Sequence, residues 1–207
     1  MKRSAVIKSL KIYAIIFMGV SAIELIFALL LALTEVTIYG ELLPISNIIL
    51  DGDLIAIEGA FIWTFLIILM ILFLILGISF IKIAKDTNLD SMKLAKFMAI
   101  LGMLILIISF IKLEYIIIMQ KIEVFYPSGE QADTFQALLY NPSITPFSAA
   151  ALWIFFTAVV CGYLVLGIIM AAGGLKWMLE MEKQNTTEPI VDKNLESPKT
   201  DESPKST

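Results

Sequence analysis

Four long apolar runs dominate the pattern of the chain, and each is bounded by polar residues. They cover residues 12–34, 59–81, 97–119 and 148–175. A helix needs about 20 mainly apolar residues to cross the hydrocarbon layer of a bilayer, which is about 30 Å thick. Within lipid, a helix satisfies every backbone N–H and C=O inside its own segment. The pattern therefore predicts an all-α integral membrane protein, a four-transmembrane-helix bundle with antiparallel neighbours.

The segments between and around these runs complete the organisation. They are a basic N-terminus (1–11), a first loop (35–58), a link (82–96), a second loop (120–147) and a C-terminal tail (176–207). The first loop mixes apolar and acidic residues around Pro44, which predicts a short hairpin or an interfacial helix. From about Gln184 the tail is rich in Lys, Glu, Ser, Thr and Pro, and we expect it to be disordered.

The distribution of basic residues predicts the orientation. Every Lys and Arg except Lys112 and Lys121 lies in the N-terminus, in the link or after the fourth run, and the first loop has none. By the positive-inside rule, the termini and the link are cytoplasmic and the two loops lie outside the cell membrane. A cleaved signal peptide is an alternative for the first run, but such peptides have apolar stretches of only about 7–15 residues.

Aromatic residues gather in the second loop, at Phe125, Tyr126, Phe135 and Tyr140. Amphipathic rings are enriched where a membrane meets water, so an aromatic belt is the favoured interpretation. A surface that contacts a partner is the alternative.

Composition supports a membrane protein and excludes several kinds of chemistry. Apolar residues make up 59% and charged residues 16%, against about 45–50% and 25% in soluble domains. There is no His and only one Cys, Cys161, so His-metal centres, Ser-His-Asp catalysis and an intrachain disulfide are excluded. A single Cys in an apolar helix is usually a small core residue. We assign no catalytic, cofactor-binding or metal-binding residue, and no basic patch suggests nucleic acid.

Glu24 is the charge that most needs an explanation, because it lies near the middle of the first run. An acidic group at the bilayer centre costs about 2.5–3.5 kcal/mol on insertion scales, so it normally faces protein and has a partner. At 100° per residue, Glu24 lies at the edge of a stripe of small residues. The stripe contains Ala14, Ser21, Ala28 and Ala32. Small residues allow helices to approach closely, so we expect Glu24 to point into a helix interface.

Depth in the membrane suggests the partners of Glu24. At 1.5 Å per residue from the cytoplasmic boundary, Glu24, Ser109 and Tyr163 each lie about 18 Å deep and Lys112 about 22 Å. The sequence predicts a buried polar layer of these four residues that joins the first and third spans. In one interpretation the layer is structural, with Glu24 paired to Lys112 or protonated. In the other, Glu24 is a proton or cation site on a translocation path. Separately, Lys112 is close enough to the outer boundary to extend to the membrane surface instead of pairing.

Small residues also suggest where helices pack. Ala95-xxx-Ala99 and Ala158-xxx-Gly162 have the spacing of close helix contacts, and we expect both to serve packing within the bundle rather than dimerisation. Gly173-Gly174 predicts a stop or bend at the end of the fourth span.

The layout resembles that of claudins and tetraspanins in topology alone, because the paired loop cysteines of those families are absent. The favoured interpretation is a non-enzymatic accessory or scaffold subunit of a membrane assembly, with the lipid bilayer and other membrane proteins as partners. The alternative is a small oligomeric channel or transporter that uses Glu24 as an intramembrane proton or cation site. A membrane enzyme is the weakest hypothesis, because the sequence offers no catalytic set.

Overall fold

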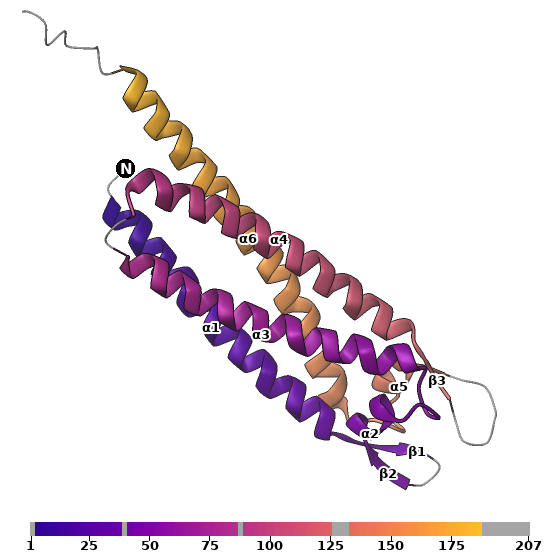
Figure 1. Cartoon of the computed structure of the whole chain (residues 1–207). Coiled ribbons are helices and arrows are strands. Elements are labelled where there is room, and N and C mark those ends of the chain that lie inside the picture. The colour runs from indigo at the N-terminus through magenta and orange to yellow at the C-terminus, as the bar shows by residue number, and fades with distance from the viewer. Residues whose placement is uncertain (1–2, 39–40, 87–88, 126–132, 188–207) are drawn as a thin grey trace, which may run out of the picture.

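Four long helices form the body of the protein (Figure 1). The computed structural model describes residues 3–38, 41–86, 89–125 and 133–187. The long helices are α1 (Arg3–Leu33), α3 (Ile57–Lys85), α4 (Ser91–Lys121) and α6 (Phe147–Thr187). All four are long and apolar enough to cross a membrane. The predicted fold class, an all-α bundle of four candidate membrane spans with antiparallel neighbours, is confirmed.

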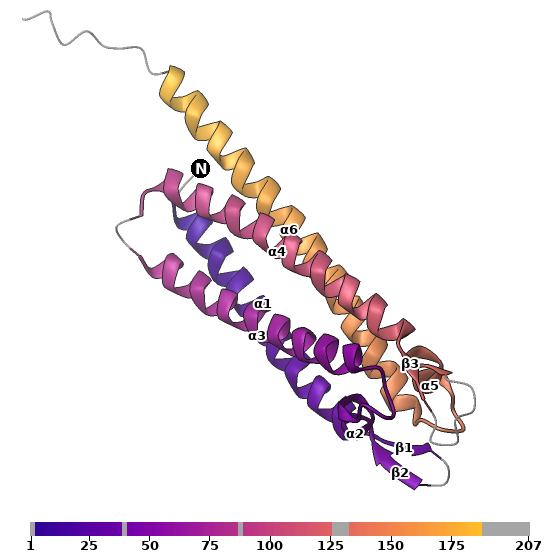
Figure 2. The ribbon, with the colours of Figure 1, turned by 45° about the vertical axis from the view of Figure 1, so that its right-hand side comes forward.

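The bundle is built from two antiparallel hairpins, α1 with α3 and α4 with α6 (Figures 1 and 2). These pairs make the most extensive contacts between elements, and the contacts of α1 with α4 and with α6 are much smaller. The start of α1, the end of α3, the start of α4 and the end of α6 all lie at one end of the bundle (Figure 1). The short elements lie at the other end.

Close packing inside each hairpin depends on glycine. A Cβ atom at Gly77 of α3 would lie 3.2 Å from the carbonyl oxygen of Ala14 in α1. In the other hairpin, a Cβ at Gly102 would lie 2.8 Å from Ala171 Cα. Real Cβ atoms essentially never approach another atom to under 3.0 Å, and a distance of 3.2 Å is tighter than most real contacts, so a larger residue would push the two helices apart. Each hairpin is therefore held by backbone contacts that only small residues permit.

The three predictions about small residues had different outcomes. Ala95 and Ala99 are buried on α4, where a Cβ at Gly174 would lie 2.8 Å from Ala99 Cα, so their predicted packing role is confirmed. The prediction for Ala158 and Gly162 is wrong: both are exposed on the outer face of α6. The predicted stop at Gly174 is also wrong, because α6 continues to Thr187. This glycine serves the contact with α4 rather than a helix end.

Part of the segment expected to be a tail is helical. α6 runs through residues 176–187, beyond the predicted end of the fourth span. Apolar residues explain the extension, because Trp177 is buried and Met178 and Met181 pack against the same buried cluster. The rest of the predicted disordered tail, residues 188–207, lies outside the described residues.

The two loops at the far end fold together. Their described residues, 34–38 and 41–56 of the first loop and 122–125 and 133–146 of the second, form one cap. The first loop forms the predicted hairpin, of β1 (Glu35–Ile38) and β2 (Glu41–Pro44). A short helix α2 (Ile45–Leu50) follows it, and this helix buries Ile45, Ile48 and Ile49 in the protein rather than lying as an interfacial helix. The second loop forms β3 (Glu123–Val124), β4 (Asp133–Thr134) and α5 (Phe135–Tyr140). The loops are joined by backbone hydrogen bonds, in which Thr37 donates to Ile144 O at 2.9 Å and Phe125 to Leu54 O at 2.7 Å.

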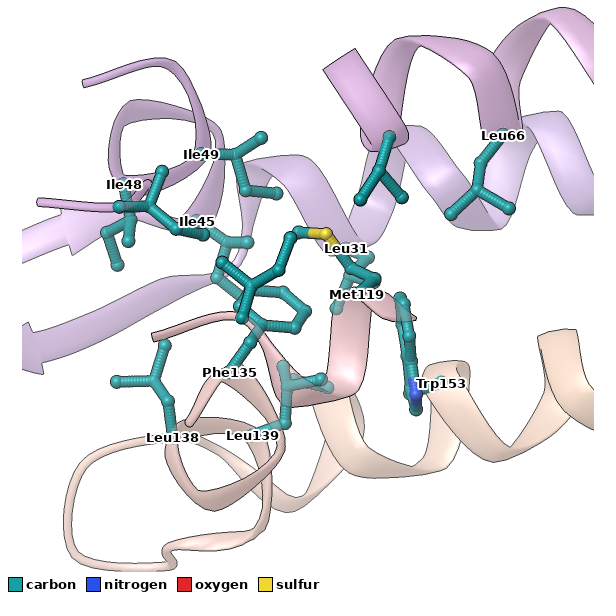
Figure 3. Packing of buried hydrophobic residues seen from close by; sticks show 14 of the residues in the cluster. Leu31, Ile45, Ile48, Ile49, Leu66, Met119, Phe135, Leu138, Leu139 and Trp153 are labelled. Carbon is teal, nitrogen blue, oxygen red and sulfur yellow. The ribbon is translucent and has the colours of Figure 1, made fainter. Parts of the chain in front are cut away.

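The cap has an apolar core of its own, continuous with the ends of the long helices (Figure 3). Side chains from α2 and α5 meet those of the helix ends there, namely Ile45, Ile48, Ile49, Phe135, Leu138, Leu139, Leu31, Met119 and Trp153. Phe135 is fully buried with its ring centroid 5.6 Å from that of Trp153, so its assignment to an aromatic belt is wrong. Phe125 and Tyr140 are exposed, and Tyr126 lies outside the described residues.

Candidate functional site

A cluster of buried polar side chains lies between the two hairpins. α1 supplies Ser21 and Glu24, α4 supplies Ser109 and Lys112, and α6 supplies Tyr163. Each of these residues is 0% or 1% exposed. Burying a polar group costs free energy unless it finds a partner, so the contacts within the cluster determine what it can do.

Glu24 and Lys112 form an ion pair. Lys112 Nζ donates a hydrogen bond to Glu24 Oε1 at 2.5 Å, and neither side chain is exposed. Lys112 therefore lies inside the bundle and does not extend to the membrane surface. Because α1 and α4 belong to different hairpins and otherwise touch little, the pair connects the two halves of the protein.

Aromatic rings surround the ion pair. The ring of Tyr163 stacks on Phe73 of α3, with centroids 4.2 Å apart and an interplanar angle of 19°. Phe17 of α1 also stacks on Tyr163, with the two ring centroids 5.3 Å apart. Lys112 Nζ is 5.6 Å from the centroids of both Phe73 and Tyr163, within the range of a cation–π interaction. The ammonium group is thus stabilised by one carboxylate and two ring faces.

Sequence reasoning missed Ser21 as a member of the cluster. The hydroxyl oxygens of Ser21 and Tyr163 are 2.9 Å apart, which joins α1 to α6. The signal was present, because Ser21 precedes Glu24 by three residues and positions i and i+3 share a helix face. Phe17 and Phe73 carried no signal, since nothing in the sequence separates a core phenylalanine from one that faces lipid.

The structure does not join every residue of the predicted polar layer. Ser109 is buried one helical turn from Lys112, yet its hydroxyl has no hydrogen-bond partner among the described residues. The second carboxylate oxygen of Glu24, Oε2, likewise has none there. Glu24 and Lys112 are in direct contact, the Tyr163 ring lies beside Lys112, and Ser109 stands apart from these interactions.

Cys161 does not belong to the core, so the prediction that placed it there is wrong. It is exposed on α6, two residues before Tyr163. Two residues correspond to about 200° of rotation around a helix, so Cys161 and Tyr163 point in nearly opposite directions. Its apolar thiol suits contact with lipid.

The cluster contains one ion pair that can exchange a proton internally. A proton that moved along the hydrogen bond from Lys112 to Glu24 would turn the ionic pair into a neutral one without changing the net charge. Across the residues that the structure describes, no three His, Cys, Asp or Glu side chains gather in a way that could hold a metal ion.

In comparisons with known proteins, no protein-family model, curated protein or solved structure matches the chain.

Proposed function

We propose that this chain is a non-enzymatic accessory or scaffold subunit of a larger membrane assembly. The observation that supports this proposal is the closed Glu24–Lys112 ion pair, in which each intramembrane charge is neutralised by the other. Removing one partner of a buried pair costs about 3–5 kcal/mol, so the intact pair fixes the relative position of the two hairpins. A rigid bundle of this kind suits a protein that presents a surface to its partners.

The cap offers such a surface. Leu42 of β2 and Leu50 of α2 are 64% and 70% exposed, and the elements that carry them are packed on the apolar core of the cap. Fully burying one leucine side chain against a partner contributes about 1.5–3 kcal/mol, so these two residues would anchor a contact. We propose that the partner binds the cap, while the long helices hold the protein in the bilayer.

Purification tests the proposed role. The tagged protein, extracted in mild detergent, is expected to bring a defined set of other membrane proteins with it, identified by mass spectrometry. Leu50→Ser, which lies outside the hollow described below, should reduce their recovery by about tenfold or more, because one leucine contributes about 1.5 kcal/mol or more and about 1.4 kcal/mol corresponds to that factor. Asp53→Asn, a polar exchange at an exposed position of the cap, is the matched control and should retain them. Unchanged recovery with the leucine variant would contradict binding at the cap.

A channel or transporter is the second candidate, and the unpartnered Oε2 of Glu24 favours it. A carboxylate oxygen without a protein partner is able to accept a proton or contact a cation. A transport path usually carries several deep polar groups and broken helices. Here α1, α3, α4 and α6 are each continuous. The same purification separates the candidates, since a homo-oligomer free of other proteins would favour transport.

The proposed orientation places both termini in the cytoplasm and the cap outside. Its support is the Lys and Arg distribution, since Lys82 and Lys85 lie in the last turn of α3, at the end of the bundle opposite the cap. In a Cys161→Ser background, Asp53→Cys should react with a membrane-impermeant maleimide in intact cells. Lys85→Cys should react only after the cells are opened. The reverse pattern would overturn the orientation.

A further inference from the structure

A groove separates the hairpins on one side of the bundle, near the cap. Between α1 and α6 it encloses about 470 Å³ and is lined mainly by apolar side chains. Its lining includes Phe27, Leu30, Thr34, Ser148, Ala151 and Phe155. The contact between α1 and α6 is small, which explains the gap. Because both helices are candidate membrane spans, the groove would face the acyl chains of a surrounding bilayer.

A second, more polar hollow of about 570 Å³ lies at the cap end of the groove. Thr34 lines the groove, and its two neighbours in the chain, Leu33 and Glu35, line the hollow. On the opposite wall, Pro146 lines the hollow and Ser148 the groove. Adjacent residues of the same two chain segments thus line the two spaces, so the spaces are neighbours and together form a candidate site with an apolar and a polar part.

Among the described residues that line the polar part, one is acidic and none is basic. The two segments of the cap contain no Lys or Arg. Their described residues include the acidic side chains Glu35, Glu41, Asp51, Asp53, Glu123 and Asp133. Glu35 lines the hollow itself, together with the polar side chains of Thr37, Ser143 and Thr145. A cationic group is attracted to such a hollow, and an anionic headgroup without a compensating cation is repelled.

We propose that this site binds one phospholipid whose headgroup carries a primary ammonium, namely phosphatidylethanolamine. One acyl chain lies in the groove and the ammonium lies beside the Glu35 carboxylate. A primary ammonium has three N–H donors and forms charge-assisted hydrogen bonds with a carboxylate, whereas the quaternary ammonium of phosphatidylcholine has no N–H to donate. The site therefore distinguishes the two zwitterionic lipids by hydrogen bonding rather than by charge.

The dimensions suit a lipid chain better than a protein helix. From Phe27 to Thr34 the groove wall spans about 10 Å, a third of the hydrocarbon thickness, at 1.5 Å per residue. A helix segment of that length, about 10 Å across, fills roughly 800 Å³. The groove offers about 470 Å³, which lies within the range of small-molecule sites.

Native mass spectrometry of the full chain, released from nanodiscs that contain equal amounts of phosphatidylethanolamine, phosphatidylcholine and phosphatidylglycerol, tests the proposal. The expected result is one retained phosphatidylethanolamine per protein. Ala151→Trp fills the groove and should lower this retention by about tenfold, which corresponds to about 1.4 kcal/mol. Ala158→Trp, at an exposed position of the same helix outside the groove, should retain the lipid. Both variants are first required to elute as a single folded species.

The headgroup is tested separately. Glu35→Gln should bind phosphatidylethanolamine and phosphatidylcholine equally, because the neutral amide no longer favours the primary ammonium. Glu41→Gln, on the paired strand of the same hairpin and outside the hollow, should keep the preference. Equal retention of all three lipids by the unmodified protein, a preference for phosphatidylglycerol, or full retention by Ala151→Trp would each overturn the proposal. So would disulfide-linked dimers of an Ala151→Cys variant in the Cys161→Ser background, which would show a second copy in the groove.

Discussion

Lys112→Met is expected to lower the free energy of unfolding by about 3 kcal/mol, the lower end of the cost of breaking a buried ion pair. Methionine fills the space of the lysine stem, so the loss comes from the charge rather than from a cavity. Glu24 would then keep a negative charge, or take up a proton, among the rings of Phe73 and Tyr163. The measurement is unfolding of the micelle-bound protein by added SDS, followed by circular dichroism.

Two matched variants show whether the pair itself is responsible. Lys93→Met removes the surface pair with Asp90, where the nitrogen and oxygen are 3.8 Å apart and the side chains 62% and 61% exposed. Exposed pairs contribute about 0–1 kcal/mol, so this variant should differ little from the unmodified protein. The double variant Glu24→Leu with Lys112→Met should regain most of the lost stability, because apolar residues of similar volume replace a buried pair without penalty. Equal losses from Lys93→Met and Lys112→Met would contradict a stabilising role for the buried pair.

The double variant also bears on the proposed function. If the chain is a scaffold whose charges only fix the hairpins, an apolar pair at positions 24 and 112 should preserve the recovery of partners. If Glu24 carries protons or cations, the same variant should fold and yet lose activity. Stability and function would then separate, which a purely structural pair does not allow.

The sequence was sufficient to predict the spans because length and apolar character decide membrane crossing. It also pointed to Glu24 and Lys112, because a charge in hydrocarbon is costly and requires an explanation. Depth alone then restricted the candidates to residues that lie at similar distances from the same membrane surface. The contact between Glu24 and Lys112 follows from these two simple constraints.

The arrangement of the helices could not be predicted in the same way. In a soluble bundle, an apolar stripe marks the buried face of each helix. In a bilayer, lipid and protein core are both apolar, so Phe73 in the core and Phe110, 62% exposed, look alike in sequence. The outward position of Cys161 was missed for the same reason. The joining of the loops by Thr37 and Ile144 depends on contacts between distant segments, which local patterns do not encode.

Gly102→Ala and Gly174→Ala are each expected to lower the free energy of unfolding by about 2 kcal/mol, a typical cost of overpacking. A Cβ at either position would lie 2.8 Å from a Cα atom of the facing helix, Ala171 or Ala99 respectively. Backbone atoms cannot rotate away as a side chain can, so α4 and α6 must separate. The separation would also weaken the packing around Tyr163, because Tyr163 is a residue of α6 and would move with it. The same SDS titration measures the effect.

Gly19→Ala and Gly162→Ala provide the controls, because a Cβ at either position meets nothing within 4 Å. Alanine favours a helix over glycine by about 1 kcal/mol, so these variants should be unchanged or slightly more stable. The two pairs carry the same chemical change inside long apolar helices and differ only in what faces the new methyl group. If all four variants behaved alike, helix propensity would account for the result. The close approach of α4 to α6 would then contribute nothing measurable to the free energy of unfolding. Opposite signs in the two pairs would instead assign the stability of this hairpin to backbone contact at Gly102 and Gly174.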